Sequence, residues 1–210
     1  FRRDTPFKRL IITASGGPFY GKTKEELENV TAADALKHPT WKMGAKITID
    51  SATLLNKGFE VIEAHHLYNA PYEKIHALVH PESIVHSMVE FEDGAVLAQL
   101  GVPSMELPVQ LAFTYPSRLA CCESLNFEKL AALHFLPLEK EKFPCFSTAI
   151  AAGEAGENYP CALNGAGEEA VHAFLRGELK FLQIADCLNE VLNGTKKQKV
   201  ESYETLKETD

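Results

Sequence analysis

The spacing of the apolar residues changes partway along this chain, and that change limits the folds available to it. The first half contains short apolar runs bounded by turn residues, which are typical of strands, at Leu10–Thr13, Ala77–His80, Ser87–Phe91 and Ala95–Leu100. From Ser147 onward the apolar spacing is helical and predicts a small bundle. We therefore expect an α/β (α+β) domain with a mixed sheet over residues 1–114, a linker over 115–142 and an α-helical domain over 143–210.

Composition excludes several classes of protein. The chain has 210 residues, 45% of them hydrophobic, and a net charge of −8, so it predicts a globular fold without the basic surface that nucleic acid requires. No apolar stretch reaches the roughly 18 residues of a membrane span, and the start lacks the apolar region of a secretory signal. The five cysteines fit neither a disulfide framework nor a CxxC metal site, which favours free thiols in a reducing compartment.

The region before the second strand mixes helical and irregular patterns. We expect a helix near Lys22–Glu28, a partly mobile loop over Thr31–Gly44, and a short strand at Ile47–Asp50. A helix should follow from Ser51 to Tyr68, with Asp50 or Ser51 as its N-cap, because either side chain can accept from the free amides of the first turn.

A glycine-rich turn follows the first strand. In Ser15-Gly16-Gly17 the absent side chains let backbone amides approach an anion, and the serine hydroxyl can donate to it. The alternative is an ordinary turn, which is the usual role of glycine pairs after strands.

The predicted 51–68 helix carries the densest set of polar groups. Ser51 provides a hydroxyl, and Asn56, Lys57 and Glu60 follow at helical spacing, so that a phosphate and a divalent cation could both be held there. The alternative is a surface helix with one Lys/Glu pair. Gly58 argues against that alternative, because glycine inside a helix normally marks a close approach of another element.

The segment His38–Gly44 contains the only tryptophan of the chain. His38, Trp41 and Met43 on an irregular loop suit a lid that closes over a ligand, although Trp41 could equally be a buried plug. The remaining candidates are histidines without metal-ligand spacing, for which structural roles are expected: His65, His66, His80 and His86.

Several blocks of sequence, in order, resemble the 1-deoxy-D-xylulose 5-phosphate reductoisomerase family. The blocks are ASGGPF, HPTWKMG, ITIDSATLLNKGFEVIEA, VHPESIVHSMVEFEDGAVLAQLG and the stretch from AIAAGEAGENYP to AVHAFL. The resemblance implies conversion of 1-deoxy-D-xylulose 5-phosphate to 2-C-methyl-D-erythritol 4-phosphate, with NADPH as reductant and Mg²⁺ or Mn²⁺ as metal. It also implies a homodimer in a bacterial cytoplasm or a plastid.

The resemblance assigns roles to individual residues. It implies catalytic roles for His38, Lys57 and Glu60, with Glu60 as a metal ligand. The substrate-binding positions that it implies are Ser15, His38, Trp41, Ser51, Asn56, Lys57 and Glu60. The cofactor-side positions that it implies are Met43, Gly44, Pro103 and Met105.

The chain departs from the family pattern in two places. The family's N-terminal NADPH-binding domain is absent from these 210 residues, and so is the following Asp-Ser-Glu segment, which supplies further metal carboxylates, so we expect the chain alone to be inactive. Gly167 stands where the family usually carries Asn.

Two alternatives remain beside the reductoisomerase. One is a stand-alone, non-catalytic phosphosugar-binding module. The other is an unrelated metal-dependent isomerase or aldolase, which leaves Gly44, Pro103 and Met105 without a role.

Overall fold

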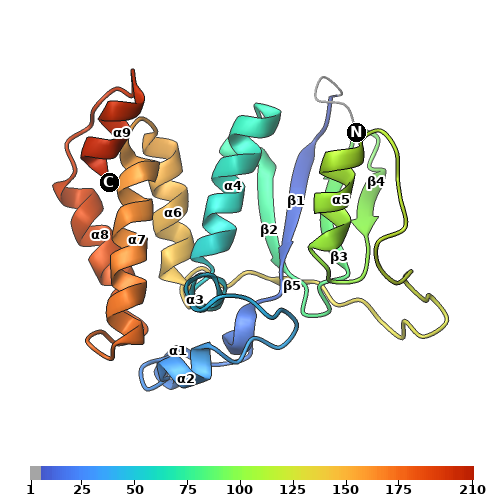
Figure 1. Cartoon of the computed structure of the whole chain (residues 1–210), viewed down its shortest axis with the longest axis horizontal. Coiled ribbons are helices and arrows are strands. Elements are labelled where there is room, and N and C mark those ends of the chain that lie inside the picture. Colours follow the sequence, from blue (N-terminus) through green and yellow to red (C-terminus); the bar gives the residue numbers. More distant parts are fainter. Residues whose placement is uncertain (1–5) are drawn as a thin grey trace.

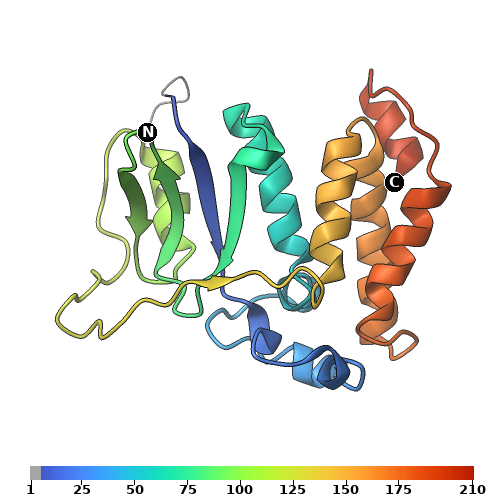
Figure 2. The same ribbon diagram turned by 180° about the vertical axis from the view of Figure 1, so that it is seen from behind.

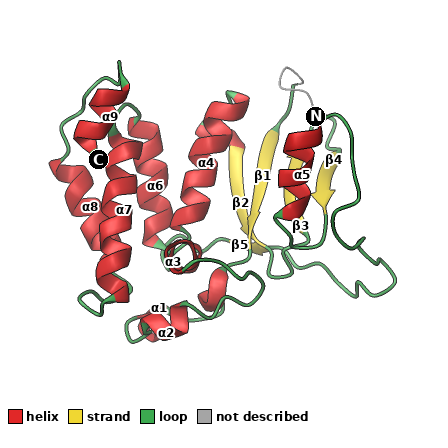
Figure 3. Ribbon diagram, viewed as in Figure 1, coloured by secondary structure: helices red, strands yellow, loops and turns green. Residues whose placement is uncertain are grey.

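The computed structural model describes residues 6–210 and contains a mixed five-stranded sheet (Figures 1 and 3). The strands are β1 Arg9–Ala14, β2 Ile75–Val79, β3 Val85–Glu90, β4 Val96–Leu100 and β5 Leu136–Pro137. Their order in the sheet is β4-β3-β1-β2-β5, with β1 and β2 parallel and every other pair antiparallel. The predicted mixed sheet is confirmed.

Two helices lie over one face of the sheet. These are α4 (Leu55–Tyr68) and α5 (Glu106–Thr114), whereas Figure 2 shows no helix of the described chain over the opposite face. Between β1 and β2 the chain also forms η1 (Gly17–Phe19), α1 (Lys24–Leu27), α2 (Ala32–Ala35) and α3 (Ala45–Ala52), and η2 (Tyr72–Lys74) directly precedes β2. The connection between the parallel strands β1 and β2 therefore contains all five of these elements and α4.

The strand predicted at Ile47–Asp50 is wrong, because these residues lie inside helix α3. The β-branched side chains favour a strand locally, but packing overrides that weak preference, and Ile49 is fully buried. Asp50 does not cap a helix as predicted. Its carboxylate is buried within α3 and receives a bond from Lys46 at 2.8 Å.

The single helix predicted from Ser51 to Tyr68 is also divided. Leu54 has a left-handed backbone (φ 59°), which ends α3 and begins α4. This conformation is uncommon for a residue other than glycine and is retained only where surrounding packing enforces it. The side chain of Leu54 is buried at 2% exposure, so the core supplies that packing.

The C-terminal part is a helical bundle, as predicted. It contains α6 (Pro144–Ala155), α7 (Tyr159–Leu175), α8 (Gln183–Gly194) and α9 (Tyr203–Thr209). Asn158 is buried and binds the tail, donating to Lys196 O at 3.2 Å and accepting from Gln198 N at 2.9 Å. These bonds hold the segment before α9 against the start of α7.

Helix α4 joins the sheet layer to the bundle. A Cβ built on Gly58 would lie 2.3 Å from Ala149 Cβ of α6, so only glycine permits this approach of the two helices. Leu55 extends the contact toward α7, where its Cδ2 would lie 3.1 Å from a Cβ on Gly167. One hydrophobic cluster consequently runs from Leu10 of β1 to Leu188 of α8.

The segment between α5 and α6 does more than connect them. Residues 136–137 form β5 and pair antiparallel with β2. The boundaries at 114 and 142 therefore remain a prediction, since the continuous core does not divide there. Among residues 6–210 no helix is long and apolar enough to cross a membrane.

The close approach at Gly58 gives a stability prediction. Gly58→Ala should lower the free energy of unfolding by about 1–3 kcal/mol, because the new methyl group must push α4 and α6 apart. Urea unfolding followed by circular dichroism measures this change.

Gly194→Ala is the matched control, because Gly194 also lies in a helix but a Cβ there meets nothing within 4 Å. That variant should be neutral or slightly stabilised. Equal stability of the two variants would contradict the role given to Gly58.

Candidate functional site

The turn after β1 lies directly against the end of α3. Gly16 and Gly17 both have positive φ angles, of 82° and 60°. A Cβ on Gly17 would lie 3.0 Å from Ala52 Cα and 3.1 Å from Ser51 O, so a larger residue would push the turn away. The glycine pair thus brings Ser15 close to Ser51.

The imidazole of His38 lies between these two serines. Its Nε2 is 3.0 Å from Ser15 Oγ and 3.2 Å from Ser51 Oγ. Ser15 Oγ also accepts from the backbone N–H of Gly17 at 3.2 Å. Three residues from separate segments, all predicted to bind substrate, therefore meet in one partly buried cluster, which we call the serine–histidine cluster.

The other ring nitrogen fixes the proton of His38. Nδ1 accepts from the backbone N–H groups of Thr40 at 3.1 Å and Trp41 at 2.9 Å, so the ring hydrogen is on Nε2. Burial lowers the pKa of His38, which favours the neutral ring.

This tautomer decides the chemistry of the serine–histidine cluster. A general base that activates a serine must accept through Nε2, whereas Nε2 of His38 donates. The oxygen of each hydroxyl can accept from the ring while its own O–H points toward a ligand. The cluster therefore offers hydrogen-bond donors to an oxygen-rich ligand and is not arranged for nucleophilic attack by serine.

A second group of predicted residues occupies the first turns of α4. Asn56 Nδ2 donates to Glu60 Oε1 at 2.7 Å, and Lys57 Nζ forms an ion pair with Glu60 Oε2. Lys57 is only 8% exposed, although it carries a charge. A buried ammonium near the amino end of a helix, where unpaired amides face outward, favours an anion.

His86 lies beside both the predicted lid and the α4 residues. Its ring centroid is 6.3 Å from that of Trp41. Burial is the main cause that lowers the pKa of His86, and the charge of Lys57 lowers it further. From its strand position, only a structural role is predicted for His86, because such a position does not reveal which residues lie across from it.

The other histidines fit the structural roles predicted for them. His65 Nδ1 contacts Ala70 O at 2.8 Å, and the His65 ring stacks on Tyr72 with centroids 4.4 Å apart. The His66 ring lies edge-on to His65, and His80 is fully buried. Trp41 is half-buried, which is less than a core plug requires.

The predicted cofactor-side residues occupy two loops. Met43 and Gly44 directly precede α3, and Gly44 O accepts from Thr48 Oγ1 at 2.7 Å. Pro103 and Met105 lie between β4 and α5, where Met105 is 64% exposed. Their cofactor roles stay predictions.

Glu60 fits a divalent cation as one carboxylate ligand, because Mg²⁺ prefers hard oxygen donors. Within residues 6–210 no group of three or more His, Cys, Asp or Glu side chains could hold a metal ion. A metal site that includes Glu60 would therefore need ligands beyond the side chains described here.

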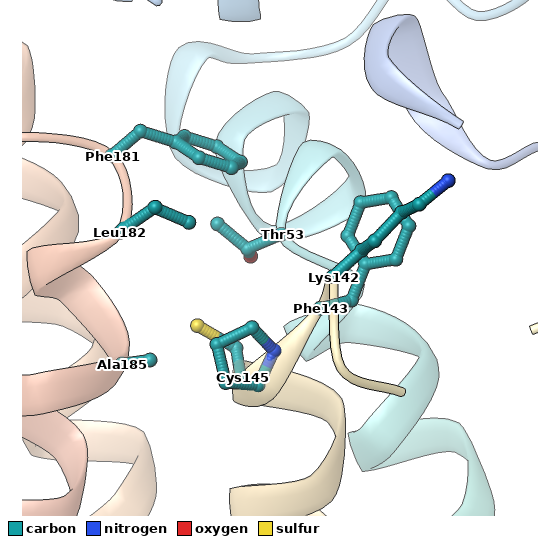
Figure 4. Close-up of a pocket in the computed structure, with 8 residues that line it drawn as sticks. Thr53, Lys142, Phe143, Cys145, Phe181, Leu182 and Ala185 are labelled. Carbon is teal, nitrogen blue, oxygen red and sulfur yellow. The ribbon is translucent and has the colours of Figure 1, made fainter. Parts of the chain in front are cut away.

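A small crevice lies apart from these residues, between the start of α6 and α8 (Figure 4). Thr53, Phe143 and Phe181 line it, and its volume of about 10 Å³ is close to the minimum for one water. Cys145 also lines the crevice, and burial raises the pKa of its thiol to about 12. The crevice is too small for a substrate and its thiol is unreactive.

Two family profiles match this chain. The profile described as "DXP reductoisomerase C-terminal domain" matches residues 100–210, which is more than half of the chain. The profile described as "1-deoxy-D-xylulose 5-phosphate reductoisomerase C-terminal domain" matches residues 2–68.

Curated relatives match over nearly the whole chain. The 1-deoxy-D-xylulose 5-phosphate reductoisomerase of Bacillus subtilis is 52% identical over 205 residues, which cover 97% of this chain and 54% of that protein. The Halalkalibacterium halodurans protein of the same name is 56% identical over 186 residues, covering 88% and 49%. The chain therefore spans about half the length of these relatives.

Solved structures show the same fold. The Zymomonas mobilis reductoisomerase in complex with NADPH has a TM-score of 0.91 at 41% identity, covering 99% of this chain and 53% of that one. A reductoisomerase in complex with NADPH, fosmidomycin and magnesium also has a TM-score of 0.91, at 38% identity, covering 97% and 52%. From these matches and the residue arrangement above, the chain belongs to the 1-deoxy-D-xylulose 5-phosphate reductoisomerase family.

Proposed function

We propose that this chain is the substrate-binding half of an enzyme that converts 1-deoxy-D-xylulose 5-phosphate to 2-C-methyl-D-erythritol 4-phosphate with NADPH. The observation that carries the proposal is the serine–histidine cluster of Ser15, His38 and Ser51, formed without a ligand. Relatives that are named 1-deoxy-D-xylulose 5-phosphate reductoisomerase, and a solved structure of that name with the same fold, support this choice of reaction.

The phosphate is the proposed ligand of the serine–histidine cluster and Lys57. The two hydroxyls can donate to phosphate oxygens, and the Lys57 ammonium adds the positive charge that a dianion requires. Lys57 is already partnered by Glu60, so a phosphate would compete with that carboxylate for the ammonium. Binding energy from the phosphate can then orient the reacting end of the sugar.

Glu60 is the proposed metal ligand of this half, with the remaining carboxylates supplied from outside the chain. When bound, Mg²⁺ or Mn²⁺ would act as a Lewis acid on neighbouring sugar oxygens and stabilise negative charge that develops there. Asn56 holds one oxygen of Glu60 and so orients the carboxylate.

Trp41 and Met43 are the proposed cover of the site. Both belong to the irregular segment that His38 Nδ1 holds through backbone bonds to Thr40 and Trp41. Ordering this segment over a bound sugar would exclude water from the reacting atoms. Met43, Gly44, Pro103 and Met105 are proposed to face NADPH, whose binding domain would come from another part of the enzyme.

A homodimer is the proposed assembly. Helix α5 has no buried residue in the described chain, and it exposes Val109 at 48% and Phe113 at 87%. On β4, an outer strand of the sheet, Leu97 is 60% exposed. A second copy covering this side would bury these apolar groups. Sedimentation equilibrium tests the dimer, and a monomer at all protein concentrations would contradict the proposal.

The reaction is tested by adding the part of a relative that this chain does not span. We would join this sequence to the amino-terminal half of the Bacillus subtilis relative and measure NADPH oxidation with 1-deoxy-D-xylulose 5-phosphate and Mg²⁺. We expect turnover by the joined protein and none by the 210-residue chain alone. Substrate binding without turnover in the joined protein would favour a phosphosugar-binding module instead.

Lys57→Ala tests the phosphate assignment. In the joined protein it should raise the KM for the phosphosugar roughly ten- to hundredfold, which corresponds to loss of a charged hydrogen bond. Lys142→Ala is the matched control, because Lys142 pairs with Glu139 at the same i,i+3 spacing but outside the site. Similar KM values for the two variants would contradict the assignment.

Glu60→Gln tests the metal assignment. It should lower kcat by roughly two to three orders of magnitude at saturating Mg²⁺, because the amide replaces an anionic ligand of the cation. Thermal unfolding should stay within a few degrees of the parent protein, since Glu60 is a partly exposed helix residue. Full activity in the variant would remove Glu60 from the metal site.

A further inference from the structure

His80 lies between the turn that carries Ser15 and the loop that carries Pro103 and Met105. It follows β2 directly, and its backbone N–H donates to Ala14 O at 2.7 Å, one residue before Ser15. The side chain is 0% exposed. A bulky polar ring in this position must have both nitrogens satisfied, or it would cost stability.

The ring does satisfy both nitrogens, and each bond reaches a different segment. Nε2 accepts from the backbone N–H of Ile84 at 3.2 Å, so the ring hydrogen is on Nδ1, which donates to His134 O at 2.7 Å. Ile84 O in turn accepts from Gly101 N at 3.0 Å. Gly101 opens the loop that carries Pro103 and Met105.

Glu82 fixes the far end of this chain of bonds. Its Oε2 accepts from the backbone N–H of His134 at 3.2 Å, and its Oε1 contacts His134 Nδ1. Glu82 Oε2 also lies 3.1 Å from Nδ1 of His80. Phe135 stacks on the His80 ring with centroids 4.7 Å apart, which holds the same segment on the other side.

We infer that His80 is a positioning residue for hydride transfer, oriented by Glu82 and His134. It links the turn that carries Ser15 with the loop of Pro103 and Met105 through main-chain bonds. Displacement of His80 would shift one loop relative to the other. The inference rests on the proposed function, because it takes the second loop to face NADPH.

The two possible roles of His80, structural or positioning, predict different effects on stability and on the rate of hydride transfer. If the ring only fills space, loosening it lowers stability and leaves the rates of the folded enzyme unchanged. If it sets the distance between substrate and cofactor, loosening it slows hydride transfer, because reacting atoms tolerate little misplacement. Affinity for the phosphosugar should hardly change, since Ser15, Ser51 and Lys57 remain in place.

Glu82→Ala in the joined full-length protein tests the inference while leaving the buried ring in place. We expect kcat to fall roughly tenfold and the KM for NADPH to rise, with the KM for the phosphosugar within about twofold of the parent. The deuterium isotope effect on kcat, measured with NADPH labelled at the transferred hydrogen, should increase as hydride transfer becomes slower. Glu82→Gln keeps an acceptor for the His134 amide and should restore most of kcat.

Glu178→Ala is the control, because Glu178 makes a comparable two-bond contact with Arg176 far from these loops. It should leave every kinetic constant unchanged. Parent-like kcat and isotope effect in Glu82→Ala, together with a lowered unfolding temperature, would overturn the positioning role. Absence of NADPH oxidation in the parent joined protein would instead refute the proposed function.

Discussion

The contact of Gly17 with the backbone of Ser51 and Ala52 is the constraint on which the substrate site depends. It allows a turn from the sheet to lie against the end of α3 with no side chain between them. Ser15 and Ser51 can then share one imidazole, and the Nδ1 bonds of His38 hold the segment that leads to Trp41. The break at Leu54 separates α3 from α4, so Lys57 and Glu60 lie in the first turns of a new helix.

Strands and helices were predictable from the sequence where the spacing of apolar residues is regular. The four predicted strands lie within two residues of β1 to β4, and Gly94, at φ 85°, lies in the turn that joins β3 to β4. The helical spacing after Ser147 likewise predicted the bundle. Gly58 was identified as a position of close approach from its residue type alone, and the contact with Ala149 explains it.

The features that the sequence did not predict arise from packing between distant segments. Ile47–Asp50 has strand-forming residues, yet burial of Ile49 stabilises a helix there. The proximity of His86 to Trp41 and the bonds between Glu82 and His134 join residues far apart in the chain. Local propensity contains no information about such pairs, whereas the family resemblance could identify only residues that share the family's motifs.

Under our proposal, the 210-residue chain by itself binds the phosphate of the sugar. Fluorescence of Trp41, the only tryptophan in the chain, measures this directly when the 210-residue protein is titrated with 1-deoxy-D-xylulose 5-phosphate or with the same sugar lacking phosphate. We predict a saturable change with the phosphosugar and a far weaker response to the unphosphorylated sugar. Equal responses to both sugars, or none to either, would contradict the claim.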